Sequence, residues 1–412
     1  MLDSQYALVV SMLTAGGLVG ALASPYFNDR HGRRLTLLGA NLFLGLGSLM
    51  ATMAWTPNAM MIGRFVSGMG VGVVTVVVPT YIAECVPRSK RGLFGALNQL
   101  AVVIGILAAQ MIGLSWSTVE HWRSILGVGV ALAAVQSCLL PLCVDSPQYL
   151  ASFPGGFNQA KRSLAQLRDG TIEQVEEEVK SWRRENEVPT KVNSWMFLTS
   201  SHYRRPLTIV LLLQVAQQLS GVNAVIFYST SIMSSVFPES SGTITACISV
   251  VNLVMTVISA ALMDRAGRRS LFLVSTSLMA LMGILLGWSI GAEYHQTSAW
   301  AIFGFIASFA IGLGPIPFLM IPEIVETQAV SSACSVGLAV NMVTNFIVSS
   351  GFLTLKSLLG PQVFYLFSLA LIVLFLIAFN ILPETKGKSA EEVIRSGYSI
   401  YPSYELVSAA NI

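Results

Sequence analysis

Long apolar runs separated by short polar turns make up most of this chain. A helix of about 20 apolar residues is long enough to cross the hydrocarbon core of a bilayer, and the sequence contains eleven such runs. Because lipid cannot satisfy exposed backbone groups, each run is expected to be helical. The predicted spans lie near 6–27, 35–55, 59–85, 92–114, 123–143, 206–235, 242–263, 271–291, 299–325, 331–355 and 361–382.

A six-residue phrase occurs twice, at 29–34 (Asp-Arg-His-Gly-Arg-Arg) and at 264–269 (Asp-Arg-Ala-Gly-Arg-Arg). Each copy lies in a turn between two apolar runs, and two further pairs of segments recur at nearly the same offset. Such a pattern predicts a membrane protein built from two related halves. The paired segments are Pro79 to Glu84 with Pro317 to Glu323, and Asp145-Ser146-Pro147 with Pro383-Glu384-Thr385.

The repeat also predicts the domain organisation. The run at 206–235 precedes the second basic turn and has no counterpart before the first, so we expect the first half to lack its first helix. Residues 145–205 are the one sizeable polar stretch and are predicted to be a cytosolic linker with short amphipathic helices at Gln159–Leu167 and Ile172–Arg184. The predicted domains are an incomplete N-terminal bundle at 1–144, the linker at 145–205, a six-helix bundle at 206–385 and a cytosolic tail at 386–412.

Composition and charge support a membrane location. The chain is 54% hydrophobic and 11% charged, with a mean hydropathy of +0.68, whereas soluble domains carry about a quarter charged residues. If the turn at 29–34 is cytosolic and the spans alternate, all but three of the 24 Lys and Arg face the cytosol. We therefore expect the N-terminus outside and the C-terminus inside. The net charge of +3 then reflects topology and does not indicate nucleic acid as a partner.

Other readings of the chain are less favoured. The start carries Asp3 and no basic residue, which argues against a cleaved signal peptide. No nucleophile constellation, phosphate loop or metal-ligand spacing is found, so we predict neither an enzyme nor a bound cofactor or metal. The cysteines lie in or at the ends of apolar runs and are expected to be packing residues: Cys85, Cys138, Cys143, Cys247 and Cys334.

Neutral amides inside the apolar runs are the candidate ligand-binding groups. Gln214, Gln217 and Gln218 are three or four residues from one another or from Gly221, so they share a helix face. An amide both donates and accepts hydrogen bonds, and none of these groups is charged, so they suit a neutral polyhydroxylated solute. Helix-to-helix bonding is the alternative role for one or two of them. Further amides in the spans are Gln99, Gln110, Asn223, Asn252, Asn341 and Asn345.

Glycine and proline interrupt the run at 299–325 in mid-membrane, at Gly312, Gly314, Pro315 and Pro317. Interrupted helices at this depth are tolerated where they line a cavity and often mark a binding site. We expect this break to face the ligand.

Acidic and basic residues recur together at the predicted cytosolic ends of both halves. Ionisable groups at a membrane boundary need a partner or a function. We predict that these groups form paired charges that bias which side of the protein is open; the alternative is that they only fix helix ends and topology. The predicted charge network comprises Asp29, Arg33, Arg34, Glu84 and Arg91 in the first half, and Asp264, Arg268, Arg269 and Glu323 in the second.

These motifs together resemble the sugar porters of the major facilitator superfamily, in particular the animal facilitative glucose transporters, over about residues 6–390. The resemblance rests on the two basic turns and on four further motifs. These are Pro79-x-Tyr81-x-x-Glu84-x-x-Pro87-x-x-x-Arg91-Gly92, Gln217-Gln218-Leu219-Ser220-Gly221-Val222-Asn223, Gly314-Pro315-Ile316-Pro317 and Pro383-Glu384-Thr385-Lys386-Gly387.

The resemblance implies an all-α major facilitator fold with two pseudo-symmetric bundles, twelve helices in the family and about eleven here. It implies facilitated, alternating-access transport of a hexose, glucose or fructose, in the plasma membrane, with a small-molecule sugar and the bilayer as partners. It assigns an outer gate to Tyr228. The implied sugar contacts are Gln99, Gln217, Gln218, Asn223, Asn252, Phe318 and Asn345.

The chain departs from the family pattern at several positions. The Gln-Leu-Ser triplet associated with glucose over fructose is Gln214-Val215-Ala216, and Phe318 and Met342 stand where the family has tryptophan. Two other hypotheses therefore remain: a proton-coupled porter of a sugar or polyol, and a truncated homologue that senses rather than transports. The other departures are Ala310 for an acidic residue, Val330 for an arginine, and Val144-Asp145-Ser146-Pro147-Gln148 for Pro-Glu-Ser-Pro-Arg.

Overall fold

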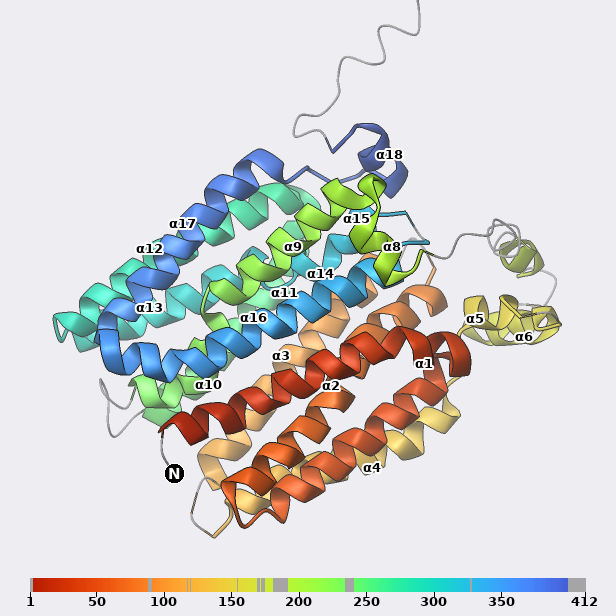
Figure 1. The fold of residues 1–412 in the computed structure, drawn as a ribbon. Helices are drawn as coiled ribbons and strands as arrows, with labels where there is room; N and C mark the ends of the chain where they lie inside the picture. Colours follow the sequence, from red (N-terminus) through yellow and green to blue (C-terminus); the bar gives the residue numbers. More distant parts are fainter. Residues whose placement is uncertain are drawn as a thin grey trace, which may run out of the picture. The chain divides into compact units, whose positions relative to one another are not determined.

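The structure is a computed structural model, and every regular element in the part of the chain that it describes is a helix (Figure 1). Nine helical stretches of that part are long and apolar enough to cross a membrane. Two of them, Gln5–Thr52 and Val330–Ile381, each contain two of the predicted spans, so all eleven predicted runs lie on helices. The described residues are 3–87, 91–116, 118, 120–153, 155–168, 171, 175–180, 192–233, 241–326 and 328–398.

The chain forms two compact units. The first comprises Met1–Asn98 and Ser115–Val192, and the second comprises Gln99–Leu114 and Asn193–Ile412. The division in sequence between Val192 and Asn193 lies inside the stretch predicted to link two bundles. Residues Gln99–Leu114 of one helix group with the second unit, which local sequence pattern did not predict.

In the first unit, α1 (Asp3–Thr52) reverses direction at Gly32, where φ is +82°. Its first arm packs closely on α2 (Pro57–Cys85): a Cβ at Gly16 would lie 2.0 Å from the Phe65 carbonyl oxygen. No residue larger than glycine fits at such a contact, and small residues are how membrane helices approach closely. The unit also contains α4 (Trp122–Leu139), and α3 (Arg91–Trp116) begins in it.

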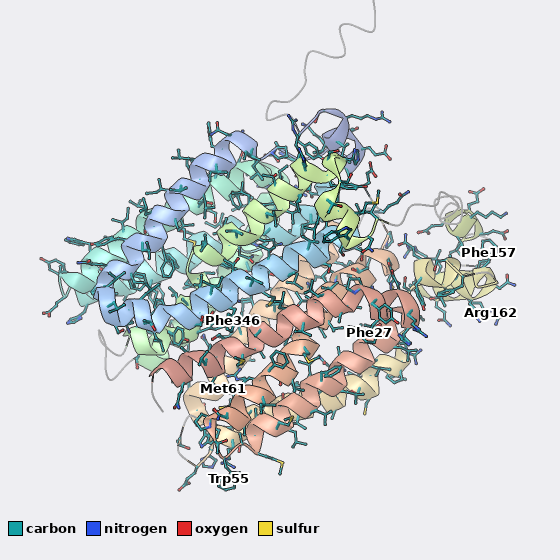
Figure 2. All side chains as sticks on the ribbon, viewed as in Figure 1. Phe27, Trp55, Met61, Phe157, Arg162 and Phe346 are labelled. Atoms are coloured by element: carbon teal, nitrogen blue, oxygen red, sulfur yellow. The ribbon has the colours of Figure 1, made fainter. Side chains whose placement is uncertain are left out.

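The polar stretch after α4 contains α5 (Pro147–Ala151) and α6 (Phe157–Arg168), from which the labelled Phe157 and Arg162 project (Figure 2). The predicted helix at Gln159–Leu167 is therefore present within α6. Of the predicted helix at Ile172–Arg184, residues 176–180 are helical and the other positions except Val175 lie outside the described residues. Hydrogen bonds from Lys161 and Lys180 lower the pKa of Glu176 to about 2, so this exposed carboxylate is ionised at neutral pH.

The second unit holds the remaining helices, and two of its apolar runs are interrupted. One break separates α9 (Arg204–Leu219) from α10 (Val222–Met233), and the other follows α13 (His295–Ser308). The other elements are α8 (Ser194–Thr199), α11 (Ser241–Ala266), α12 (Arg268–Gly291), α14 (Ile316–Leu319), α15 (Ile321–Ile324), α16 (Val330–Leu359), α17 (Val363–Ile381) and α18 (Ala390–Arg395).

Candidate functional site

The amides predicted from sequence meet the interrupted helices of the second unit, where α9 and α16 run side by side (Figure 1). The α9–α10 break occurs at Ser220 and Gly221. Gly221 has φ +80°, and a Cβ there would lie 2.7 Å from a ring carbon of Phe367. Glycine is therefore required at this position for both backbone conformation and space. The break bends the chain directly after the glutamine pair.

The second break begins with a π-helical turn, Phe309–Leu313, and continues through the Gly-Pro-x-Pro segment to α14. A helix interruption frees backbone carbonyls that must find other donors. Here Gln217 Nε2 donates to the oxygens of Gly314 (2.7 Å) and Leu313 (3.3 Å), and Gln214 Nε2 donates to Pro317 O at 3.2 Å. The two glutamines of α9 thus satisfy backbone carbonyls that the helix break leaves without an intrahelical donor.

Serines on the neighbouring helices hold the π-helical turn from the other side. Ser275 of α12 donates from Oγ to Ser308 O (2.6 Å) and accepts from the Leu313 N–H (2.9 Å). Ser259 of α11 donates to Ile311 O at 2.7 Å. Neither serine was singled out in the sequence. Their role depends on the helix break that they bond, which lies far away in the sequence, and nothing in the residues next to them indicates it.

Asn341 on α16 joins the glutamines into one network. Its Nδ2 donates to Gln214 Oε1 and Gln217 Oε1, both at 2.8 Å, and its Oδ1 accepts from Gln218 Nε2 at 2.9 Å. Gln218 Oε1 in turn accepts from Asn223 Nδ2 at 2.7 Å. Five neutral amides from α9, α10 and α16 are therefore connected without a charged group among them.

Three amides have hydrogen-bonding atoms left over. Asn223 Oδ1, Asn345 Nδ2 and both amide atoms of Asn252 have no hydrogen-bond partner among the described residues, whereas Asn345 Oδ1 accepts from Ser349 Oγ at 2.8 Å. None of these atoms is fully enclosed without a partner, so each borders space that a solute or water can reach. These are the groups of the second unit that remain available to a ligand.

The other predicted site residues are more scattered. Gln99 is half-buried on α3 with no hydrogen bond to a described residue, and Phe318 is half-buried on α14. Tyr228, the predicted outer gate, is fully buried; its hydroxyl donates to Ser349 O at 3.1 Å and its ring stacks on Phe352 at 5.4 Å. Gln110 accepts a hydrogen bond from Ser249 of α11.

Part of the predicted charge network is directly visible in the first unit. Arg33 Nη2 lies 2.6 Å from Glu84 Oε1, with both side chains only 12% exposed, and Ser146 Oγ donates to Glu84 Oε2 at 2.5 Å. Arg33 also donates to Asn28 O at 3.3 Å. Positive φ at Gly32 turns the chain so that Arg33 reaches this carboxylate. The first charge cluster is defined as Arg33, Glu84 and Ser146.

The second unit repeats this arrangement group by group. Arg268 Nη2 lies 3.0 Å from Glu323 Oε1, Thr385 Oγ1 donates to Glu323 Oε2 at 2.5 Å, and Arg268 Nη1 donates to Met263 O at 3.1 Å. Gly267 has φ +87°, like Gly32. The second charge cluster is defined as Arg268, Glu323 and Thr385. The sequence repeat contained the segments of Ser146 and Thr385, but the predicted charge network named only the charged residues and left these two hydroxyls out.

The remaining predicted charges lie around these clusters. Arg269 donates to Phe379 O at 2.8 Å, and Glu384 accepts from the Arg268 N–H at 2.9 Å. The side chains of Arg91 and Asp264 lie outside the described residues. Asp29 takes part in at least one polar or electrostatic interaction, and Arg34 is half-buried at the turn.

Arg64, which is half-buried, is one of the three Lys and Arg residues that the predicted topology does not place on the cytosolic side. Arg64 lies within α2, and its Nε is enclosed without a hydrogen-bond partner among the described residues. A basic residue placed far from the cytosolic side of its span is the signal that marks it.

The family described as sugar (and other) transporters matches residues 2–396 of the chain. The chain belongs to this family of sugar transporters. The chain is 36% identical over 403 residues to facilitated glucose transporter member 4 of Homo sapiens, with 95% of this chain and 79% of that protein covered. A probable metabolite transport protein of Saccharomyces cerevisiae is 33% identical, with 96% and 83% covered.

Solved structures show the same fold for this sugar transporter. The proton:xylose symporter XylE bound to 6-bromo-6-deoxy-D-glucose superimposes with a TM-score of 0.81 at 22% identity, covering 96% of this chain and 90% of that one. A partially occluded, inward-open xylose transporter from E. coli gives 0.80 at 21% identity, with 94% and 91% covered. The expected all-α major facilitator fold and the family resemblance are thereby confirmed.

Proposed function

We propose that this sugar transporter carries a hexose, glucose or fructose, down its gradient by alternating access, in the plasma membrane. The observation that carries the proposal is the uncharged amide network together with the open amide groups of Asn223, Asn252 and Asn345. Such groups match the donors and acceptors of sugar hydroxyls and provide no opposite charge for a charged solute. The proposed sugar contacts also include Gln99, Gln217, Gln218 and Phe318, with Tyr228 as the outer gate.

Facilitated transport is favoured over proton coupling because α9, α10 and α16 contain no carboxylate in their sequences. The relatives named as facilitated glucose transporters agree with this choice. We propose that the two charge clusters hold the cytosolic helix ends together in one state of the cycle and separate in the other. Paired charges of this kind supply differential contacts between two states, which a conformational cycle requires.

The proposal is tested by uptake of radiolabelled glucose and fructose into proteoliposomes containing the full chain. We expect saturable flux that is independent of an imposed proton gradient. Replacing Asn223 or Asn252 by Ala should weaken sugar affinity about tenfold, since a lost hydrogen bond to a buried partner costs about 1–3 kcal/mol. Asn380→Ala on α17 is the control, because Asn380 bonds only its own helix at Leu376 O.

Two results would contradict the proposal. Flux that accelerates with an inward proton gradient would indicate symport. Absence of saturable binding for either hexose, by equilibrium binding as well as flux, would exclude this substrate class.

A further inference from the structure

The direction of every hydrogen bond in the amide network follows from two backbone carbonyls. The side-chain ends of Gln214 and Gln217 meet the oxygens of Pro317 and Gly314, at 3.2 and 2.7 Å. A carbonyl oxygen only accepts, so the glutamine atom there must be nitrogen. Both glutamine oxygens therefore point away from the broken helix, and both point at Asn341.

Asn341 passes this direction on. Facing two acceptor oxygens at 2.8 Å, it must present its Nδ2, because the opposite orientation would place oxygen against oxygen twice. Its Oδ1 then faces Gln218, which must donate, and Gln218 Oε1 must accept from Asn223 Nδ2. At the end of this chain of bonds, the amide oxygen of Asn223, Oδ1, is left as an acceptor, and the second hydrogen of Asn223 Nδ2 is left as a donor.

We propose that Asn341 is a positioning residue that transmits the polarity of the helix break to Asn223, so that Asn223 Oδ1 is fixed as an acceptor for a sugar hydroxyl that donates there. The inference rests on the proposed function, since it names which hydrogen-bonding role the substrate must fill there. Asn345, one turn further along α16, has the opposite character: Ser349 occupies its oxygen and its Nδ2 remains as a donor. The site thus distinguishes hydroxyls that donate from groups that only accept.

A first test needs no sugar. Asn341→Asp keeps the shape but places a second oxygen against Gln214 and Gln217, whereas Asn345→Asp keeps the acceptor that Ser349 uses. The purified full-length protein carrying Asn341→Asp should therefore unfold at a clearly lower Tm than Asn345→Asp. A Tm for Asn341→Asp equal to or above that of Asn345→Asp would overturn the inference, whatever the protein transports.

The second test uses glucose analogues in which one hydroxyl is replaced by hydrogen or by fluorine at the same carbon. Fluorine can accept weakly but cannot donate. In the unaltered chain, replacing the hydroxyl at one carbon by fluorine should lower the affinity as much as replacing it by hydrogen, about tenfold in each case. In the Asn223→Ala variant, the sugar with the hydroxyl at that carbon should no longer bind better than either analogue.

Asn341→Leu provides the readout that a merely structural role would not change. Without Asn341, the Gln218 amide is held only by the long contact of its Nε2 to Gln217 Oε1 at 3.5 Å. The amides of Gln218 and Asn223 can then turn, and Asn223 can present nitrogen to the sugar. The fluorinated analogue at that carbon should then bind better than its deoxy partner, while the other analogues fall in parallel. A uniform loss for all analogues would contradict the inference. If the unaltered chain binds no hexose at all, the proposed function fails, and the Tm comparison still decides the role of Asn341.

Discussion

Gly221 shows how much a single position contributes to the site. It adopts a left-handed backbone conformation and lies against the Phe367 ring, and its neighbours on either side are Ser220 and Val222. This turn directs Gln218 towards Asn341 and Asn223 at the same time. A residue without a side chain therefore determines where the hydrogen-bonding side chains lie.

Replacing Gly221 by Ala should destabilise the protein by more than about 1–2 kcal/mol, the cost of the left-handed conformation alone, because the new methyl group also overlaps Phe367. Gly351→Ala is the matched control: that glycine lies inside α16 with open space at its Cβ, so alanine should be neutral or stabilising. Thermal unfolding of both variants measures the difference. Equal Tm values would show that the turn at Gly221 is not constrained.

The role of the glutamines was only partly predictable. Their spacing placed Gln214 and Gln217 on one face, and both bond the same broken helix. The sequence could not reveal that their nitrogens are occupied by carbonyls about 100 residues away, because that contact depends on tertiary packing. Whether Gln217 also touches a sugar remains a prediction. Because its nitrogen is bonded to backbone carbonyls, its oxygen is the atom that would contact the sugar.

At the scale of elements, the two interrupted helices depend on each other. The carbonyls freed by the π-helical turn and Gly-Pro-x-Pro segment are satisfied from α9, while α11 and α12 hold the turn through Ser259 and Ser275. Proline and glycine in the sequence predicted the second break. The break at Ser220 and Gly221 lay inside a run predicted as one span, since a single glycine in an apolar helix is usually tolerated.

Ser275→Ala should destabilise the π-helical turn, because it removes a donor from Ser308 O and an acceptor from the Leu313 N–H. We expect a loss of about 1–3 kcal/mol in stability and weaker sugar binding. Ser277→Ala, on the same helix, removes only a hydrogen bond to the local Val274 O at an exposed position. Thermal unfolding and sugar affinity, measured for both variants, should separate them; indistinguishable results would contradict the assigned role of Ser275.

At the scale of the molecule, the orientation in the membrane can be tested by labelling. Trp55, 86% exposed after α1, and Arg162 on α6 are both labelled in Figure 2. In a chain whose five cysteines have been replaced, Trp55→Cys should react with an impermeant thiol reagent added to intact cells, and Arg162→Cys should react only after permeabilisation. The reverse pattern would invert the predicted topology.

The two charge clusters lead to a second prediction at this scale. Arg33→Leu and Arg268→Leu should each lower stability by about 1–3 kcal/mol, since each leaves a half-enclosed carboxylate without its cation. Their effects should add in the double variant, because Arg33 and Arg268 pair with different carboxylates, Glu84 and Glu323. Arg30→Leu is the control, an exposed arginine bonded to Tyr26. Unfolding free energies that fail to add would show that the clusters are coupled.

The large-scale pattern was the most predictable part of the molecule. Apolar run length alone located the eleven spans, because the bilayer sets one requirement that every span must meet. Short helices outside the long apolar runs, such as α5, α8 and α18, were missed as separate elements, since they form through local caps and tertiary contacts. Ser389, for example, begins α18 through a capping box with Glu392.

The paired charge clusters have a consequence for how this protein tolerates change. The hexapeptides at 29–34 and 264–269 differ only at His31 and Ala266, so the two copies are nearly identical in sequence. Arg33 nevertheless bonds Glu84 of the first unit and Arg268 bonds Glu323 of the second, so neither arginine can substitute for the other when one is damaged. The duplication therefore makes the two units alike but does not make either turn redundant. A harmful substitution in one turn should have the same effect as it would in a protein that had a single such turn.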